Sequence, residues 1–104
     1  MKGLLMKEFL FVYGTLQNPA VQQFVFGRPI AGTYDILEGF TRSTISLGTE
    51  TYFIVEQEDG STVEGLLLEI TPEELTRADR YETSDYRRFH VTLRSGQEAW
   101  VYGK

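Results

Sequence analysis

Residues 9–16 read FLFVYGTL, an apolar run that ends at a glycine followed by a small hydroxyl residue. The five apolar residues Phe9–Tyr13 are typical of a buried strand, and Gly14 marks its transition to a loop. Backbone N–H groups of Tyr13–Leu16 can face a ligand there, as in the nests that bind carboxylates and oxyanions. An ordinary tight turn is the alternative, because no GxGxxG or GxxxxGK[ST] phosphate-binding pattern is present.

The segment that follows is expected to be mostly strand. A short helix is expected over Ala20–Phe26, after an Asn-Pro pair, and the β-formers and glycines of residues 30–45 favour twisted or bulged strands. The segments Tyr52–Glu56 and Thr62–Ile70 flank Glu58-Asp59-Gly60, and the Asp-Gly pair predicts a hairpin at that point.

Two more strands are expected near the end of the sequence. Apolar and polar side chains alternate over residues 88–94, a Ser-Gly turn follows, and 99–102 form a last apolar run. The alternation places Arg88 on the solvent face together with His90, which we interpret as a surface imidazole. Five or more strands in 104 residues predict a small barrel or a strongly curled sheet.

One clear helix is predicted between these strands. Thr71-Pro72-Glu73-Glu74 supplies an N-cap threonine, a proline at the first helical position and a glutamate at the third, which together form a capping box. The helix is expected to run from Pro72 to about Glu82.

Glu82 has an unusual predicted position for a carboxylate. At about 100° per residue it lies in line with Leu75 and Ala78, which are expected to face the core. It also lies at the helix C-terminus, where the dipole disfavours negative charge. Both effects raise the pKa of a carboxyl, as a general acid/base requires. Alternatively, the helix ends early and Glu82 lies in solvent or pairs with Arg87 or Arg88.

Composition excludes several classes of protein. The 104 residues suit one domain, 1–104, and a formal net charge of −5 argues against nucleic-acid or membrane-surface partners. With no Cys and a single His, a thiol nucleophile, a disulfide frame and a multi-histidine metal centre are all excluded. The apolar run near the N-terminus is shorter than a secretory or membrane segment. We therefore expect a cytoplasmic protein without metal or cofactor; the sequence leaves the oligomeric state open, with a monomer favoured.

Three motifs in order resemble a known family. They are FVYGTL at 11–16, DRYE at 79–82 and YRR at 86–88. This combination is similar to the γ-glutamylcyclotransferase-like family, and most similar to its small γ-glutamylamine cyclotransferase branch, which includes avirulence-induced plant proteins. The resemblance covers Phe9 to Tyr102. It implies an α+β fold, a small, mostly antiparallel β-barrel with flanking short helices and a cavity at one end.

The resemblance also implies roles for individual residues. Glu82 matches the catalytic glutamate, and Tyr86 with Arg88 matches a Tyr-x-Arg motif. Spacing alone also allows Tyr86, four residues after Glu82, to line the same pocket. Thr83-Ser84-Asp85 is shorter than the loop of many members, which is expected to change the pocket rim and hence the substrate. The matches to the backbone loop that holds the substrate are Tyr13, Gly14, Thr15 and Leu16.

The expected reaction is an intramolecular acyl transfer without a cofactor. The α-amino group of a γ-glutamyl amine or γ-glutamyl amino acid attacks its own γ-carbonyl and releases 5-oxoproline and a free amine, with Glu82 moving the protons. The main alternative is a non-catalytic module that binds a small acidic metabolite or peptide in the same pocket. A protein-interaction domain would instead need a large exposed apolar patch.

Overall fold

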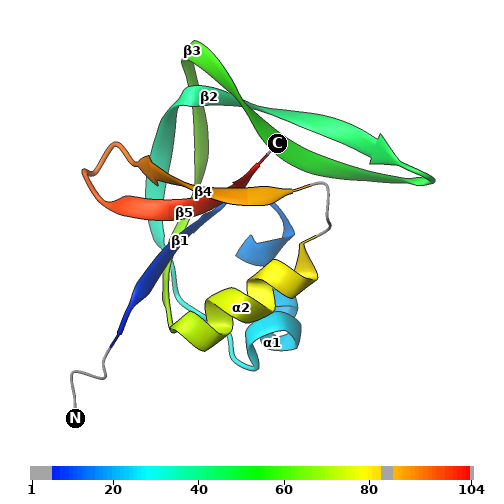
Figure 1. The fold of residues 1–104 in the computed structure, drawn as a ribbon, viewed down its shortest axis with the longest axis vertical. Coiled ribbons are helices and arrows are strands. Elements are labelled where there is room, and N and C mark those ends of the chain that lie inside the picture. Colours follow the sequence, from blue (N-terminus) through cyan, green and yellow to red (C-terminus); the bar gives the residue numbers. More distant parts are fainter. Residues whose placement is uncertain (1–5, 83–85, 104) are drawn as a thin grey trace.

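The computed structural model describes residues 6–82 and 86–103, and it shows one curled five-stranded sheet with two helices packed beside it (Figure 1). The strand order is β2-β3-β1-β5-β4, and neighbouring strands are antiparallel except β1 and β5, which are parallel. The mostly antiparallel α+β fold expected from the resemblance is therefore confirmed, in the form of a half-barrel. The elements are β1 (Glu8–Val12), a 3-10 turn η1 (Thr15–Gln17), α1 (Pro19–Phe26), β2 (Thr33–Leu47), β3 (Glu50–Ile70), α2 (Pro72–Tyr81), β4 (Arg87–Thr92) and β5 (Glu98–Gly103).

After Glu8, the residues of β1 are all apolar because both faces of the strand are covered. Leu10 and Val12 belong to the core between the sheet and the helices, whereas Phe11 and Tyr13 belong to the core inside the barrel. All four side chains are at most 6% exposed. The continuous apolar run is thus the pattern of a central strand, buried on both sides.

The hairpin predicted at Glu58-Asp59-Gly60 is wrong, because β3 continues through these residues. Glu38 of β2 pairs with Thr62, and Phe40 pairs with Gln57, so the extra residues of β3 form a bulge opposite Gly39. Gly60 has a φ of 86°, a left-handed conformation that glycine adopts in some bulges as well as in tight turns. The Asp-Gly pair therefore predicts the positive φ of Gly60 correctly, but it does not predict where the chain reverses.

The chain instead reverses at the two-residue loop Gly48-Thr49, between the paired residues Leu47 and Glu50. Gly48 has a φ of 66°, the value that tight hairpin turns require. Because β2 and β3 both continue past the bulge, they form a long two-stranded arm that extends beyond the rest of the sheet (Figure 1).

The edge strands of the half-barrel are linked across their seam. The Arg94 N–H donates to the Ile36 carbonyl at 2.9 Å, and the Arg94 side chain forms an ion pair with Glu38 at 3.0 Å. The rings of Phe40 and Phe89 stack with their centroids 5.8 Å apart. These contacts hold the sheet in its curled form.

α2 begins as predicted. Thr71 Oγ1 accepts a hydrogen bond from the Glu74 N–H at 3.1 Å, and the Glu74 carboxylate accepts one from the Thr71 N–H at 2.9 Å. The last helical residue is Tyr81, and Glu82 is the C-cap residue. Among the described residues, no helix is long and apolar enough to cross a membrane.

Candidate active site

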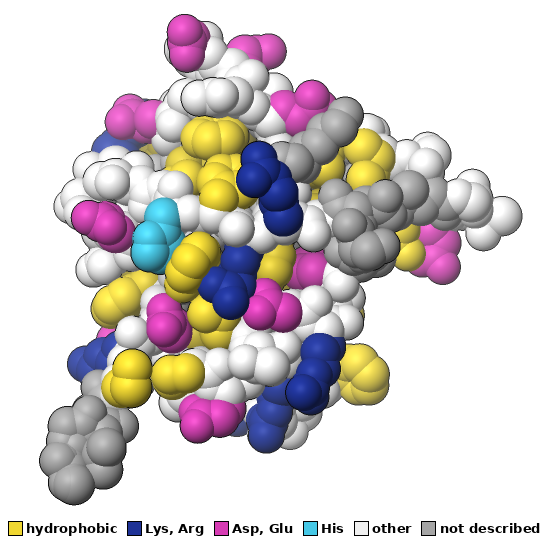
Figure 2. Space-filling view, in the orientation of Figure 1, with side chains coloured by type: hydrophobic (Ala, Val, Ile, Leu, Met, Phe, Trp, Pro, Cys, Tyr) yellow, Lys and Arg dark blue, Asp and Glu magenta, His cyan; other side chains and the backbone are white. Residues whose placement is uncertain are grey.

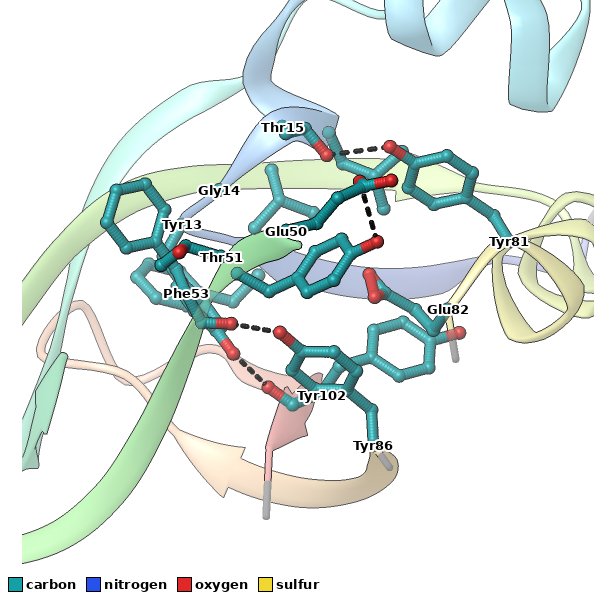
Figure 3. Close-up of a pocket in the computed structure, with 14 residues that line it drawn as sticks. Tyr13, Gly14, Thr15, Glu50, Thr51, Phe53, Tyr81, Glu82, Tyr86 and Tyr102 are labelled. Carbon is teal, nitrogen blue, oxygen red and sulfur yellow. Dashed lines mark hydrogen bonds between the residues drawn. The ribbon is translucent and has the colours of Figure 1, made fainter. Parts of the chain in front are cut away.

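A cavity of about 360 Å³ lies where three segments meet: the loop after β1, the end of α2 and the β2–β3 arm (Figure 3). The loop comes at the end of the buried strand β1, and the arm reaches over it because β3 continues beyond the bulge. All of the residues singled out for substrate binding and catalysis line this cavity: Tyr13, Gly14, Thr15, Leu16, Glu82 and Tyr86.

The loop after β1 forms one 3-10 turn. Its first hydrogen bond runs from the Gln17 N–H to the Gly14 carbonyl at 3.1 Å, so the amides of residues 14–16 take no part in the bonding of the turn. Leu16 is 3% exposed and anchors the turn in the core, and its carbonyl accepts a hydrogen bond from Gln22 Nε2 at 2.9 Å. Backbone donors are therefore held in place at the cavity wall.

Two tyrosines connect this loop to the rest of the site. Thr15 Oγ1 and the Tyr81 hydroxyl lie 2.8 Å apart, which joins the loop to the last residue of α2. The Tyr13 hydroxyl donates to the Tyr102 carbonyl at 2.5 Å. Burial raises the pKa of Tyr13, and the nearby Tyr86 and Glu82 raise it further, so its hydroxyl remains protonated.

Glu82 points into the cavity from the end of α2 (Figure 3). Its side chain is half-buried, and burial raises the pKa of its carboxyl to about 7. Within the described ranges, no ion pair or hydrogen bond to this carboxyl is present. A carboxyl with such a pKa is populated in both protonation states near neutral pH, so it can both accept and donate a proton.

Arg88 departs from the solvent-facing position expected from the alternation. It forms an ion pair with Asp79 of α2, with Nε and Oδ1 2.8 Å apart, and its guanidinium lies 4.2 Å from the ring centroid of Trp100. Asp79 also accepts a hydrogen bond from the Tyr102 hydroxyl at 2.6 Å. Arg88 therefore ties α2 to the sheet and does not line the cavity.

His90 lies away from the cavity, as expected of a surface imidazole. It is exposed on β4 (Figure 2), and its ring centroid is 3.7 Å from that of Trp100. Neither ring lines the cavity, so the one histidine of the chain is not positioned to act there.

The start of β3 contributes a wall that the sequence did not reveal. Glu50, Thr51, Tyr52 and Phe53 all line the cavity, and the Tyr86 hydroxyl donates to the Phe53 carbonyl. Tyr52 and its neighbours carry the pattern of a strand but no local signal of a binding site. Their place depends on the pairing of β2 with β3, which no short motif encodes.

The Thr83-Ser84-Asp85 loop, expected to alter the rim, lies outside the described residues. In residues 6–82 and 86–103, no group of three or more His, Asp or Glu side chains could hold a metal ion. The ionisable side chains among the described residues that line the cavity are two carboxylates, Glu50 and Glu82, and several tyrosines.

A family model described as "Gamma-glutamyl cyclotransferase, AIG2-like" matches residues 10–104, and the chain belongs to this family. The resemblance inferred from the three motifs is thereby confirmed. No curated protein sequence matches the chain.

Solved structures share the fold. The solution structure of Arabidopsis thaliana At3g28950.1 has a TM-score of 0.82 and 23% identity, over 99% of this chain and 65% of that one. The solution structure of Arabidopsis thaliana At5g39720.1 has a TM-score of 0.81 and 25% identity, over 95% of this chain and 69% of that one. A structure named gamma-glutamyl cyclotransferase has a TM-score of 0.76 and 16% identity, over 94% of this chain and 66% of that one. The chain thus spans about two thirds of the length of each of these structures.

Proposed function

We propose that the protein is a cyclotransferase that acts on γ-glutamyl amines or γ-glutamyl amino acids and releases 5-oxoproline and a free amine. The observation that carries the proposal is the position of Glu82, whose carboxyl faces the cavity with a pKa raised by burial to about 7. The family match and the backbone loop at residues 14–16 support the same reaction class.

The cavity suits a substrate that cyclises on itself. Because the α-amino nucleophile and the γ-carbonyl belong to one molecule, the main task of the protein is to fold the glutamyl chain into a ring-closing geometry. The amides of residues 14–16 act as donors to the oxyanion that develops as nitrogen attacks the carbonyl carbon. Tyr13 and Tyr86 shape the surface on which the substrate folds.

Glu82 carries protons from the attacking nitrogen to the leaving nitrogen. It first takes a proton from the substrate ammonium, and the free amine then forms the new N–C bond. The protonated carboxyl next gives this proton to the leaving nitrogen, and the old C–N bond breaks. A second proton passes from the ring nitrogen to the departing amine by the same route, which leaves a lactam N–H and an ammonium product.

Glu82→Gln tests this role. Glutamine keeps the size of the side chain but cannot accept the proton, so kcat for 5-oxoproline release is expected to fall by about 10²–10⁴. The measurement is 5-oxoproline release from a panel of γ-glutamyl amines and amino acids, with the fold of the variant checked by circular dichroism.

Glu73→Gln is the matched control, because Glu73 is an exposed residue of the same helix and lies outside the cavity. It is expected to retain the activity of the unmodified protein. Full activity in a folded Glu82→Gln variant would contradict the assignment of Glu82. Binding of γ-glutamyl compounds without turnover of any panel member would instead favour a non-catalytic binding module.

A further inference from the structure

The arm of β2 and β3 places a second carboxylate at the cavity. Glu50 begins β3, is exposed to solvent and also lines the cavity, so it lies at the mouth (Figure 3). The Tyr52 hydroxyl donates to Glu50 Oε1 at 2.9 Å, which orients the carboxylate. An oriented carboxylate retains acceptor sites, since each of its oxygens can accept two hydrogen bonds.

Two tyrosine rings share the cavity with this carboxylate. Tyr52, which donates to Glu50, and Tyr81 both line the cavity, and Tyr81 is held by its hydrogen bond with Thr15 at 2.8 Å. The faces of aromatic rings attract cations, and a neighbouring carboxylate adds charge-assisted hydrogen bonding. The combination is chemically suited to an ammonium group.

No cationic side chain offsets these carboxylates in the described lining, which contains no Lys, Arg or His. The Arg42 guanidinium contacts two lining residues from outside: it stacks over the Phe53 ring at 4.3 Å and donates to the Tyr13 carbonyl at 3.3 Å. Arg42 is therefore occupied beside the cavity wall. A leaving group that carries a carboxylate would meet the Glu50 carboxylate at the mouth, and no cationic side chain of the described lining would offset the repulsion.

The orientation of the substrate directs its variable end toward Glu50. In the proposed reaction the α-amino group must lie beside Glu82, and the γ-carbonyl oxygen beside the amides of residues 14–16. With the glutamyl half held at the half-buried Glu82 and the loop amides, the exposed end of the cavity at Glu50 is the part left for the leaving amine.

We propose that Glu50 determines substrate specificity by favouring γ-glutamyl amides whose leaving amine carries a second positive charge. The inference rests on the proposed cyclotransferase function. It concerns the leaving group, whereas the role of Glu82 concerns the glutamyl half that all candidate substrates share.

Three γ-glutamyl compounds of equal chain length test the inference. Their leaving groups are butylamine, which is neutral at its far end, diaminobutane, which ends in an ammonium, and aminobutanoate, which ends in a carboxylate. The value of kcat/KM for 5-oxoproline release is expected to be highest for the diaminobutane compound and lowest for the aminobutanoate compound. The preference should weaken as salt is added, because a charge at the cavity mouth is screened.

Variants of Glu50 separate charge from shape. Glu50→Gln is expected to lower the ratio of kcat/KM between the diaminobutane and butylamine compounds by about 1.5- to fivefold, the range for an exposed charge pair. Glu50→Lys is expected to reverse the order of the diaminobutane and aminobutanoate compounds. The control is Glu56→Gln, which removes the same charge from β3 outside the cavity and is expected to leave the ratio unchanged.

The outcomes distinguish the two proposals. If all three compounds are turned over and Glu50→Gln leaves their ratios unchanged, the role of Glu50 is wrong and the cyclotransferase function stands. The same holds if Glu56→Gln changes the ratios as much as Glu50→Gln does. If none of the three compounds releases 5-oxoproline, the proposed function fails and the inference fails with it.

Discussion

Glu82 lies where an ionised carboxylate is disfavoured in two ways. Its side chain is half-buried beside tyrosine rings, and it caps the C-terminal end of α2, where the last carbonyls carry partial negative charge. Burial raises the pKa of its carboxyl from 4.5 to about 7. Because the unfolded chain has no such environment, the same shift also couples the folding stability to pH.

The stability of the protein is expected to contain a component that falls as pH rises. Between about pH 4.5 and 7 the folded state holds a proton on Glu82 that the unfolded state has lost, so the free energy of unfolding decreases with pH. Glu82→Gln removes this component. Urea unfolding at pH 5 and pH 8 should therefore show that the variant gains stability relative to the unmodified protein at the higher pH.

The comparison with Glu82→Gln is needed because other carboxyls act in the opposite direction. Burial tends to raise the pKa of Asp79, but its hydrogen bonds with Arg88 and Tyr102 outweigh burial and lower it. The free energies of unfolding of Glu82→Gln and of the unmodified protein are compared at both pH values. If their difference is the same at pH 5 and at pH 8, the raised pKa of Glu82 is contradicted.

At the residue scale, the sequence predicted the orientation of those side chains whose position depends on local helix geometry. The helical wheel aligned Glu82 with Leu75 and Ala78, and these two are 4% and 0% exposed in the structure. The capping box fixes where the helix begins, and its period of about 3.6 residues per turn then fixes that alignment. The sequence did not predict that Glu50 and Tyr52 line the cavity, because their position depends on how far the β2–β3 arm extends and where it curls.

Among the elements, the pairing of β1 with β3 is tight enough to require a glycine at position 65. A Cβ on Gly65 would lie 2.4 Å from the Val12 carbonyl oxygen and 2.8 Å from Phe11 Cζ. One of these strands would have to shift, and Val12 immediately precedes the loop that contains Gly14.

Gly65→Ala is expected to lower the free energy of unfolding by about 1–3 kcal/mol or more, because it overpacks the sheet. The measurement is urea unfolding at neutral pH. Gly14→Ala is the control for stability, since a Cβ there would lie 3.8 Å from Phe53 Cδ2, an ordinary contact. Equal stability of the two variants would show that the backbone at Gly65 can adjust.

The Asp59-Gly60 pair shows why elements are harder to predict than residues. A local motif specifies a positive φ, and Gly60 has one, but both a turn and a bulge satisfy that requirement. Which of them forms is decided by the partner strand, since β2 pairs with β3 on both sides of the bulge. The strand pattern was therefore predicted well, and the long arm was not.

At the scale of the whole molecule, Arg42 connects the arm to the loop after β1. It stacks on Phe53 of β3 and donates a hydrogen bond to the Tyr13 carbonyl, whose peptide group also carries the Gly14 N–H. A donor on this carbonyl polarises the peptide and strengthens the amide as a donor. Arg42 therefore acts as a positioning residue between two walls of the cavity.

Arg42→Ala is expected to lower kcat by roughly two- to tenfold, because one ordinary hydrogen bond contributes about 0.5–1.5 kcal/mol. Arg42→Lys should restore part of the loss, because lysine keeps the charge but not the planar geometry. Both variants are measured on the preferred γ-glutamyl substrate, with KM determined separately. A change in KM alone, or in thermal stability alone, would contradict a role in strengthening the amide donor.

The position of β1 at the middle of the sheet has a consequence for how the molecule assembles. Its partners lie far away in the sequence: Leu10 pairs with Leu68 of β3 and with Trp100 of β5. Strand pairing over such distances is slow, and an apolar segment without its partners is prone to aggregate. During synthesis FLFVY leaves the ribosome long before β5 exists, so the nascent chain is expected to depend on chaperones until its last strand is made.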